Sequence, residues 1–229
     1  MKNRILPSVL FAITVLIISC TAADSASHPE ASVEKKKDVV PDKVKKTTKA
    51  SEHKHSNENS HKATALSSRA DDIENYATQK GYSTKYCFLI DMSIASGRNR
   101  FFVYDLENKT VAYSGLVAHG CCNETFISHP KFSNSSSSGC SSLGKYKVGG
   151  YYVGKYGPSY RLYGLESSNS NAFQRGVVIH GYDCVPDKQI YPMVLCNSLG
   201  CPMVSYNFFD RLSHIIDHSE KPILLWIYR

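Results

Sequence analysis

The 229-residue sequence has no hydrophobic run long enough to cross a membrane, and its last two thirds have almost no excess of charge. Its most apolar run, residues 9–18, is far shorter than the roughly 20 residues that a bilayer of about 30 Å requires. Although the formal charge is +7, residues 71–229 carry 15 Lys and Arg against 13 Asp and Glu. This balance argues against a domain that binds nucleic acid.

Residues 1–20 have the layout of a secretory signal peptide, which does not contribute to the fold. Lys2 and Arg4 precede the apolar run, and Ser19 and Cys20 follow it. The ending resembles a bacterial lipobox, which implies that Cys20 is lipidated and anchors the chain to a membrane. We therefore expect a periplasm-facing protein of the bacterial cell envelope, with the outer membrane favoured by Thr21. The alternative is an ordinary signal peptide that contains a cysteine. In either case the thiols reach an oxidising compartment.

Residues 21–70 contain no aromatic side chain and are rich in Lys, Ser and His. Such a segment cannot bury enough apolar surface to offset the entropy of ordering, so we predict a disordered linker. Its His53, His55 and His61 could bind a metal, but solvated histidines are the simpler interpretation.

Residues 71–229 are predicted to form one mainly β domain with a few short helices. Asp71 and Ile73 favour a helix that ends before Gly81, and Ser205 precedes a second segment with helical apolar spacing. Between and after them lie short runs rich in aromatic and β-branched residues, separated by Gly, Asn and Ser. These runs are residues 86–94, 101–106, 110–119, 145–153, 160–165, 177–180 and 222–228. This pattern is typical of a β-sandwich or barrel.

One histidine and one cysteine carry the candidate chemistry. His180 ends a predicted strand, and Cys201 lies in a glycine-containing turn before a helix. A free thiol with a pKa near 8.5 needs a base to become a nucleophile at neutral pH, and a histidine can supply it. The turn also leaves backbone N–H groups near the sulfur, a candidate oxyanion site. Taken alone, the pair is weak evidence, because a buried structural cysteine and a hydrogen-bonded core histidine are the commoner explanation of such a pair.

The order Ile-His180-Gly181, about twenty residues, then Ser198-x-Gly200-Cys201 resembles the catalytic signature of L,D-transpeptidases. Residues 86–228 are similar to the branch of murein L,D-transpeptidase catalytic domains. Further segments stand in the order that this branch has, at residues 117–120, 132–134, 141–146, 151–157, 162–166 and 175. The resemblance implies an L,D-transpeptidase-like β-sandwich or barrel that acts on peptidoglycan stem peptides.

The resemblance also implies roles for individual residues. Cys201 matches the nucleophile that forms a thioester with the stem peptide, and His180 matches its base. Gly181 matches the residue whose carbonyl orients the imidazole, and the N–H groups of Gly200 and Cys201 match the oxyanion donors. An amine from a neighbouring stem peptide then forms the cross-link. Two alternatives remain open: an L,D-carboxypeptidase, in which water replaces the amine, and a non-catalytic wall-binding lipoprotein. We expect no cofactor or metal, and a monomer.

Two further residues are expected at the substrate. Ser198 precedes the nucleophile, and His119 matches a histidine at the mouth of the same site. Each has a simpler interpretation, as a turn residue and as a histidine held by backbone hydrogen bonds. Leu199 stands where the main family has a second histidine, so the role of that histidine in substrate positioning is lost. A metal site formed by His119, Cys121 and Cys122 is disfavoured, because adjacent cysteines rarely suit tetrahedral ligand spacing.

Six cysteines remain besides Cys20 and Cys201. An even number in an oxidising compartment suggests up to three disulfides, and six cysteines allow fifteen connectivities. We favour Cys184–Cys196, because these residues bracket the segment between His180 and Cys201. The alternative is a set of buried small hydrophobic residues.

Overall fold

The structure, a computed structural model, describes residues 49–229. The predicted signal peptide, Cys20 and residues 21–48 of the predicted linker lie outside the described residues. No helix within residues 49–229 is both long and apolar enough to cross a membrane.

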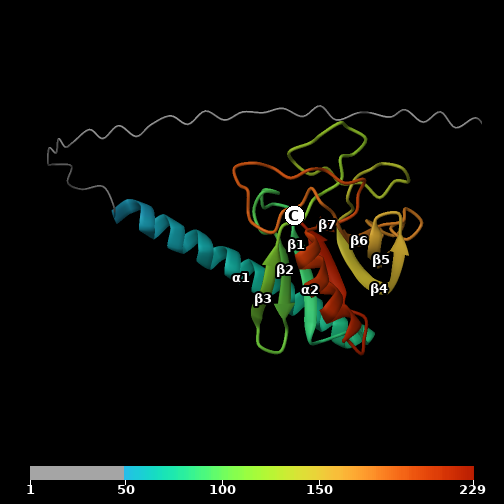
Figure 1. The fold of residues 1–229 in the computed structure, drawn as a ribbon. Coiled ribbons are helices and arrows are strands. Elements are labelled where there is room, and N and C mark those ends of the chain that lie inside the picture. The colour runs from blue at the N-terminus through green and yellow to red at the C-terminus, as the bar shows by residue number, and fades with distance from the viewer. Residues whose placement is uncertain (1–48) are drawn as a thin grey trace, which may run out of the picture. The chain divides into compact units, whose positions relative to one another are not determined.

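Within residues 49–229, eight strands form one sheet that is nearly closed into a barrel (Figure 1). The strands are β1 (Tyr86–Asp91), β2 (Phe101–Asp105), β3 (Thr110–Gly115), β4 (Gly144–Gly154), β5 (Gly157–Gly164), β6 (Val178–Gly181), β7 (Met203–Val204) and β8 (Leu224–Tyr228). Their order in the sheet is β3-β2-β1-β8-β4-β5-β6-β7, so β8 joins β1 to β4 in the middle. The prediction of a mainly β domain is confirmed.

Helix α1 (Lys49–Lys80) is longer than the sequence predicts. It begins within residues 21–70, the segment interpreted as a linker, and not near Asp71. Its buried side chains, Ala70, Ile73 and Ala77, pack with residues of β1, β2 and β8. Residues 49–80 contain no Gly or Pro, so nothing in their sequence interrupts the helix N-terminal to this packed part. Apolar periodicity indicates only the helical turns that pack against the sheet, so the sequence does not predict the N-terminal turns of α1.

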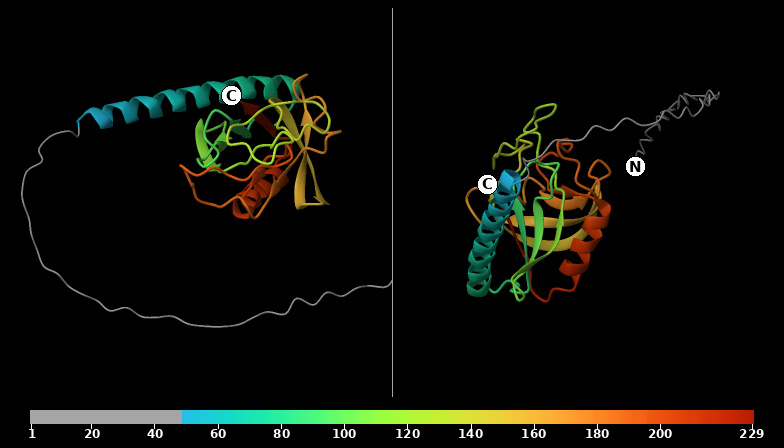
Figure 2. Two further views of the ribbon diagram at one scale, coloured as in Figure 1. Left: turned by 90° about the horizontal axis from the view of Figure 1, so that it is seen from above. Right: turned by 90° about the vertical axis from the view of Figure 1, so that its left-hand side faces the viewer.

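Helix α2 (Tyr206–Asp217) forms as predicted. The Ser205 side chain accepts a hydrogen bond from the Phe208 backbone N–H at 3.2 Å, which caps the first turn. Phe208, Phe209 and Leu212 then enter the main core inside the curved sheet. The right-hand view of Figure 2 has α1 and α2 on opposite sides of the sheet, so each face of the sheet packs against one helix.

The limits of the predicted strands differ from the structure, and at the C-terminal ends the largest differences are in β1 and β3. β1 ends at Asp91, whose Oδ1 accepts a hydrogen bond from the Ser93 N–H at 2.9 Å and starts a turn. β3 ends at Gly115 instead of residue 119. Beyond it the chain turns toward β7, where the Ala118 N–H donates to the Met203 carbonyl at 2.9 Å. The segments that follow β3 and β6 therefore gather at one end of the sheet (Figure 1).

Candidate active site

Two neighbouring strands bring His180 and Cys201 together. β6 and β7 pair in parallel, with His180 opposite Met203, two residues after Cys201. The His180 N–H also lies 3.5 Å from the carbonyl oxygen of Pro202, which directly follows the cysteine. A parallel pair requires a long crossover, and the roughly twenty residues between the two motifs supply it. The separation along the sequence is thus the connection that allows both residues to line one cavity.

A cavity of about 220 Å³ separates the histidine from the cysteine turn. Its lining residues are Tyr156, His180, Tyr182, Asn197, Ser198, Leu199, Cys201 and Met203. Among these described residues none is acidic or basic apart from His180. Leu199 is 67% exposed, so an apolar side chain stands at the rim where the main family has its second histidine.

His180 is held in one tautomer by its own neighbour. The ring is buried, and Nδ1 lies 3.0 Å from the Gly181 carbonyl oxygen. A carbonyl can only accept a hydrogen bond, so Nδ1 carries the proton and Nε2 of the neutral ring has a free lone pair. Burial lowers the pKa of His180, and the bond to the Gly181 carbonyl partly offsets that effect. The ring is therefore neutral at pH 7 and can act as a base.

Cys201 rests as a thiol. Burial raises its pKa, while the Val178 backbone N–H and the Arg175 guanidinium act in the opposite direction. The residue as a whole is partly exposed, and its thiol makes a long 3.9 Å contact to the Gly176 carbonyl oxygen. The cavity is thus lined by a protonated thiol and a neutral imidazole, with no preformed ion pair between them.

The turn before Cys201 requires glycine at position 200. Gly200 has a φ of +114°, and a Cβ on it would lie 2.7 Å from the Cys140 carbonyl oxygen. Its N–H donates to the Ser198 Oγ at 3.0 Å. The expected role of Gly200 as an oxyanion donor would require this N–H to leave the Ser198 hydroxyl. The Cys201 N–H, in contrast, has no protein acceptor within the described residues.

Ser198 belongs to the cavity and to the scaffold behind it. The side chain lines the cavity although the residue is only 5% exposed. Its N–H donates to the His119 carbonyl and its carbonyl accepts from the Cys121 N–H, both at 2.8 Å. The backbone that precedes Cys201 is thus fixed to the segment after β3.

His119 is not brought to the cavity, which corrects the expectation that it contacts substrate. Its ring is fully buried, with Nδ1 2.9 Å from the Arg100 Nη2 and Nε2 3.3 Å from the Asn197 Nδ2. Burial and the Arg100 charge lower the pKa of His119 to about 4. Arginine can only donate, so Nδ1 accepts and the ring is neutral. The residue supports the site from behind through its backbone carbonyl.

Three residues near the site were not singled out from the sequence. Tyr156, at the tip of the β4–β5 hairpin, stacks on the His180 ring. Asn197 makes two hydrogen bonds to the Ile127 backbone, at 2.7 and 3.0 Å. Arg175 donates to the carbonyls of Ser133 and Cys140 beside Gly200. Residue 175 and the 151–157 segment belong to the pattern of the resemblance, but nothing in the sequence alone indicates these contacts.

The predicted Cys184–Cys196 disulfide is confirmed, and it closes the segment between His180 and Cys201. A second disulfide, Cys122–Cys140, spans the segment between β3 and β4. A third does not form among the described residues, because Cys87 is buried on β1 and Cys121 remains free. Since Cys122 is oxidised and the His119 ring contacts Arg100 and Asn197, these residues form no metal cluster in this part of the chain.

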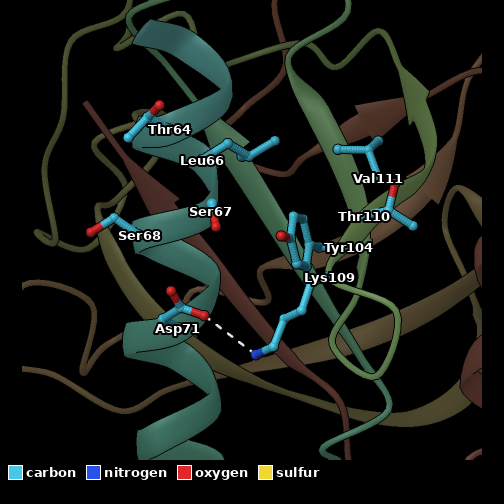
Figure 3. A pocket seen from close by; sticks show the side chains of 9 residues that line it. All are labelled: Thr64, Leu66, Ser67, Ser68, Asp71, Tyr104, Lys109, Thr110 and Val111. Atoms are coloured by element: carbon cyan, nitrogen blue, oxygen red, sulfur yellow. Dashed lines mark hydrogen bonds and ion pairs between the residues drawn. The ribbon is translucent and has the colours of Figure 1, made fainter. Parts of the chain in front are cut away.

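A larger cavity of about 660 Å³ lies elsewhere, between α1 and the β2–β3 hairpin (Figure 3). The Tyr104 ring faces it, and Lys109 extends across to Asp71 with an Nζ–Oδ1 distance of 3.3 Å. Neither His180 nor Cys201 lines this cavity. The candidate chemistry is thus confined to the smaller cavity at the β6–β7 end of the sheet.

The fold and the cavity define a mainly β domain with a paired cysteine and histidine. Residues 45–228 match the family described as the L,D-transpeptidase catalytic domain. Because this match covers most of the sequence, the chain belongs to the L,D-transpeptidase catalytic domain family.

Solved structures give weaker matches. The Ldtfm–avibactam carbamoyl enzyme is 12% identical with a TM-score of 0.38, over 63% of this chain and 49% of that chain. An L,D-transpeptidase from Xylanimonas cellulosilytica is 15% identical with a TM-score of 0.36, over 67% and 68%. The helical cell shape determining protein Pgp2 from Campylobacter jejuni is 13% identical with a TM-score of 0.38, over 63% and 47%. The chain thus spans about half the length of the first and third structures. No curated protein matches the sequence.

Proposed function

We propose that this chain is a peptidoglycan L,D-transpeptidase that transfers an acyl group through a thioester on Cys201. The observation that carries the proposal is the parallel β6–β7 pairing, with His180 and Cys201 on the walls of one cavity. Membership of the L,D-transpeptidase family supports stem peptides of peptidoglycan as the substrate class.

His180 is the base in this proposal. Its Nδ1–H donates to the Gly181 carbonyl, so Nε2 is the atom that can receive the thiol proton. The Cys201 side chain turns from the Gly176 carbonyl toward Nε2, and the S–H bond breaks as the new N–H bond forms. Because burial lowers the pKa of His180 and raises that of Cys201, proton transfer accompanies attack on the substrate.

The oxyanion is stabilised by the Cys201 N–H together with the Ser198 hydroxyl. The Ser198 Oγ accepts from the Gly200 N–H, which leaves its own hydrogen available to the cavity it lines. Gly200 then shapes the turn without contacting the oxyanion. Loss of one donor in such a site typically slows turnover by about 10²–10³-fold.

The reaction proceeds in two balanced steps. The thiolate attacks the carbonyl between the third and fourth stem residues, and the terminal D-residue leaves as an amine that takes the proton from His180. An amine from a second stem peptide then attacks the thioester and forms the cross-link, which regenerates the thiol. A cavity of about 220 Å³ is small beside typical ligand pockets of about 300–1,000 Å³, so it suits the scissile region of the peptide.

The test is incubation of the purified chain with muropeptides, followed by mass spectrometry of the products. Cross-linked dimers that disappear in Cys201→Ala would support the proposal, and Cys121→Ala is the matched control because it removes another free, partly exposed thiol. Tripeptides without dimers would identify an L,D-carboxypeptidase. No product from the unsubstituted chain would favour a non-catalytic wall-binding protein.

We also propose that Cys20 carries a lipid anchor that holds the domain at the periplasmic side of the bacterial envelope, with the outer membrane favoured. The proposal is supported by the signal-like order of residues 1–20. Mass spectrometry of the N-terminal fragment tests it, since an acylated Cys20 is expected. An N-terminus without acyl groups would contradict it.

A further inference from the structure

An aromatic ring covers one face of the His180 imidazole. Tyr156 stacks on it with a centroid distance of 4.7 Å and an interplanar angle of 16°, and Tyr182 approaches edge-on at 6.0 Å and 84°. Tyr156 comes from the turn between β4 and β5, where Gly157 has a φ of +75°. The pairing of Ser159 with His180 sets this turn beside the imidazole. The stacked pair therefore depends on the register of two neighbouring strands.

Within residues 64–229, no carboxylate faces the imidazole. Gly181 contributes a neutral carbonyl to Nδ1. Titratable neighbours are Tyr156, Tyr182 and Cys201 on the cavity wall, and Tyr206 of α2, whose ring lies against Gly181. Two cations lie farther out, the Lys155 ammonium, 5.5 Å from the centroid of the Tyr156 ring, and the Arg175 guanidinium beside the cysteine turn. An imidazolium formed here has no carboxylate partner among the described residues.

We infer that Tyr156 is a positioning residue for His180, which fixes the plane of the imidazole and stabilises the imidazolium formed when the Cys201 proton reaches Nε2. The electron-rich face of an aromatic ring attracts a cation, and this attraction is stronger in a desolvated site. The flat contact also restricts rotation of the imidazole, which the described part of the chain otherwise holds by one hydrogen bond, at Nδ1. The direction of proton transfer in this inference rests on the proposed function. The stacking of Tyr156 on His180 is independent of it.

The test is a pH titration of His180, in which histidine-selective NMR on the purified chain monitors the ring. The chain has nine histidines, and the His180 signals are those lost in His180→Gln. Tyr156→Leu retains apolar bulk but removes the aromatic face. We expect it to lower the pKa of His180 by about half a unit, the size of a modest cation–π contact. Tyr156→Phe should restore the unsubstituted value, since it keeps the ring.

The matched control is Tyr151→Leu, on the same hairpin, because Tyr151 is 54% exposed and its ring packs edge-on against Tyr160 instead of on His180. It should leave the His180 titration unchanged. A pKa of His180 that stays constant or rises in Tyr156→Leu would overturn the inference, because the ring would then only exclude water. If Tyr156→Leu does not fold, the chemical shifts of the His180 ring protons in the unsubstituted chain provide the test. The absence of an upfield ring-current shift would overturn the inference.

A second measurement separates this inference from the proposed function. The rate of Cys201 alkylation by iodoacetamide against pH reports the thiol–imidazole pair without any peptidoglycan. We expect its acidic limb to move to lower pH in Tyr156→Leu but not in Tyr156→Phe. A chain that shows this shift yet leaves muropeptides unchanged would refute the transpeptidase proposal and support the positioning role. A chain that cross-links muropeptides but shows no shift would support the transpeptidase proposal and refute the positioning role of Tyr156.

Discussion

Removal of the Cys184–Cys196 disulfide should lower the free energy of unfolding by about 3 kcal/mol. The two cysteines are 12 residues apart, and the chain-entropy relation for a loop of this size gives roughly that value. For a domain of 150–250 residues, each kcal/mol corresponds to about 2–4 °C in Tm. The double variant Cys184→Ala/Cys196→Ala should therefore melt roughly 6–12 °C below the unsubstituted chain.

The single tryptophan provides the assay. Trp226 lies on β8 in the middle of the sheet, between β1 and β4, so its fluorescence during urea unfolding reports loss of the sheet. At a temperature where both proteins remain folded, turnover should also fall, since the bridged segment sets the approach of His180 to Cys201. A control variant, Cys122→Ala/Cys140→Ala, opens a loop of similar size outside this segment. An unchanged midpoint after loss of Cys184–Cys196 would show that the bridge adds no constraint to the unfolded chain.

Three further predictions concern single residues. His180→Ala should slow acylation by about 10²–10⁴-fold. In the unsubstituted chain the acidic limb of the pH–rate profile should lie below pH 6.5, because burial lowers the pKa of the base; a limb above 6.5 would contradict this. Gly200→Ala should abolish turnover and lower stability by roughly 1–3 kcal/mol in urea unfolding, since its φ is +114°. The pKa of His119, about 4 when folded, is below its unfolded value near 6.5, so the unfolded state binds the proton first. Stability should decline by up to about 3 kcal/mol from pH 6.5 to 4, and a chemical-denaturation series should show a weaker decline in His119→Gln.

The sequence predicts those parts of the fold that depend on local chemistry. Ser205 caps its helix because a serine side chain can satisfy an N–H three residues later. The Cys184–Cys196 pair is predictable because both residues bracket one crossover. β7 is not, since Met203 and Val204 are too few to show an alternating pattern and are ordered by pairing with β6.

The site was only partly predictable for a related reason. His180 and Cys201 are recognised by residue type and spacing, and their neighbours are set by tertiary packing. His119 ends a strand-like run, so from the sequence it could equally face a cavity or the interior. Its contact with Arg100, 19 residues earlier, places the ring in the interior. Ser198 occupies the Gly200 N–H through a turn whose geometry the Ser-x-Gly pattern does not specify.

The central position of β8 has a consequence for how the chain folds. β1 to β3 form one half of the sheet and β4 to β7 the other, and β8 alone pairs with both. During synthesis, the two halves can therefore form separately, but strand pairing cannot link β1 to β4 until residues 224–228 have been made. Such non-local pairing slows folding and leaves strand edges exposed in the meantime. A nascent chain that lacks β8 should accordingly remain open between β1 and β4, and should be sensitive to proteolysis and aggregation.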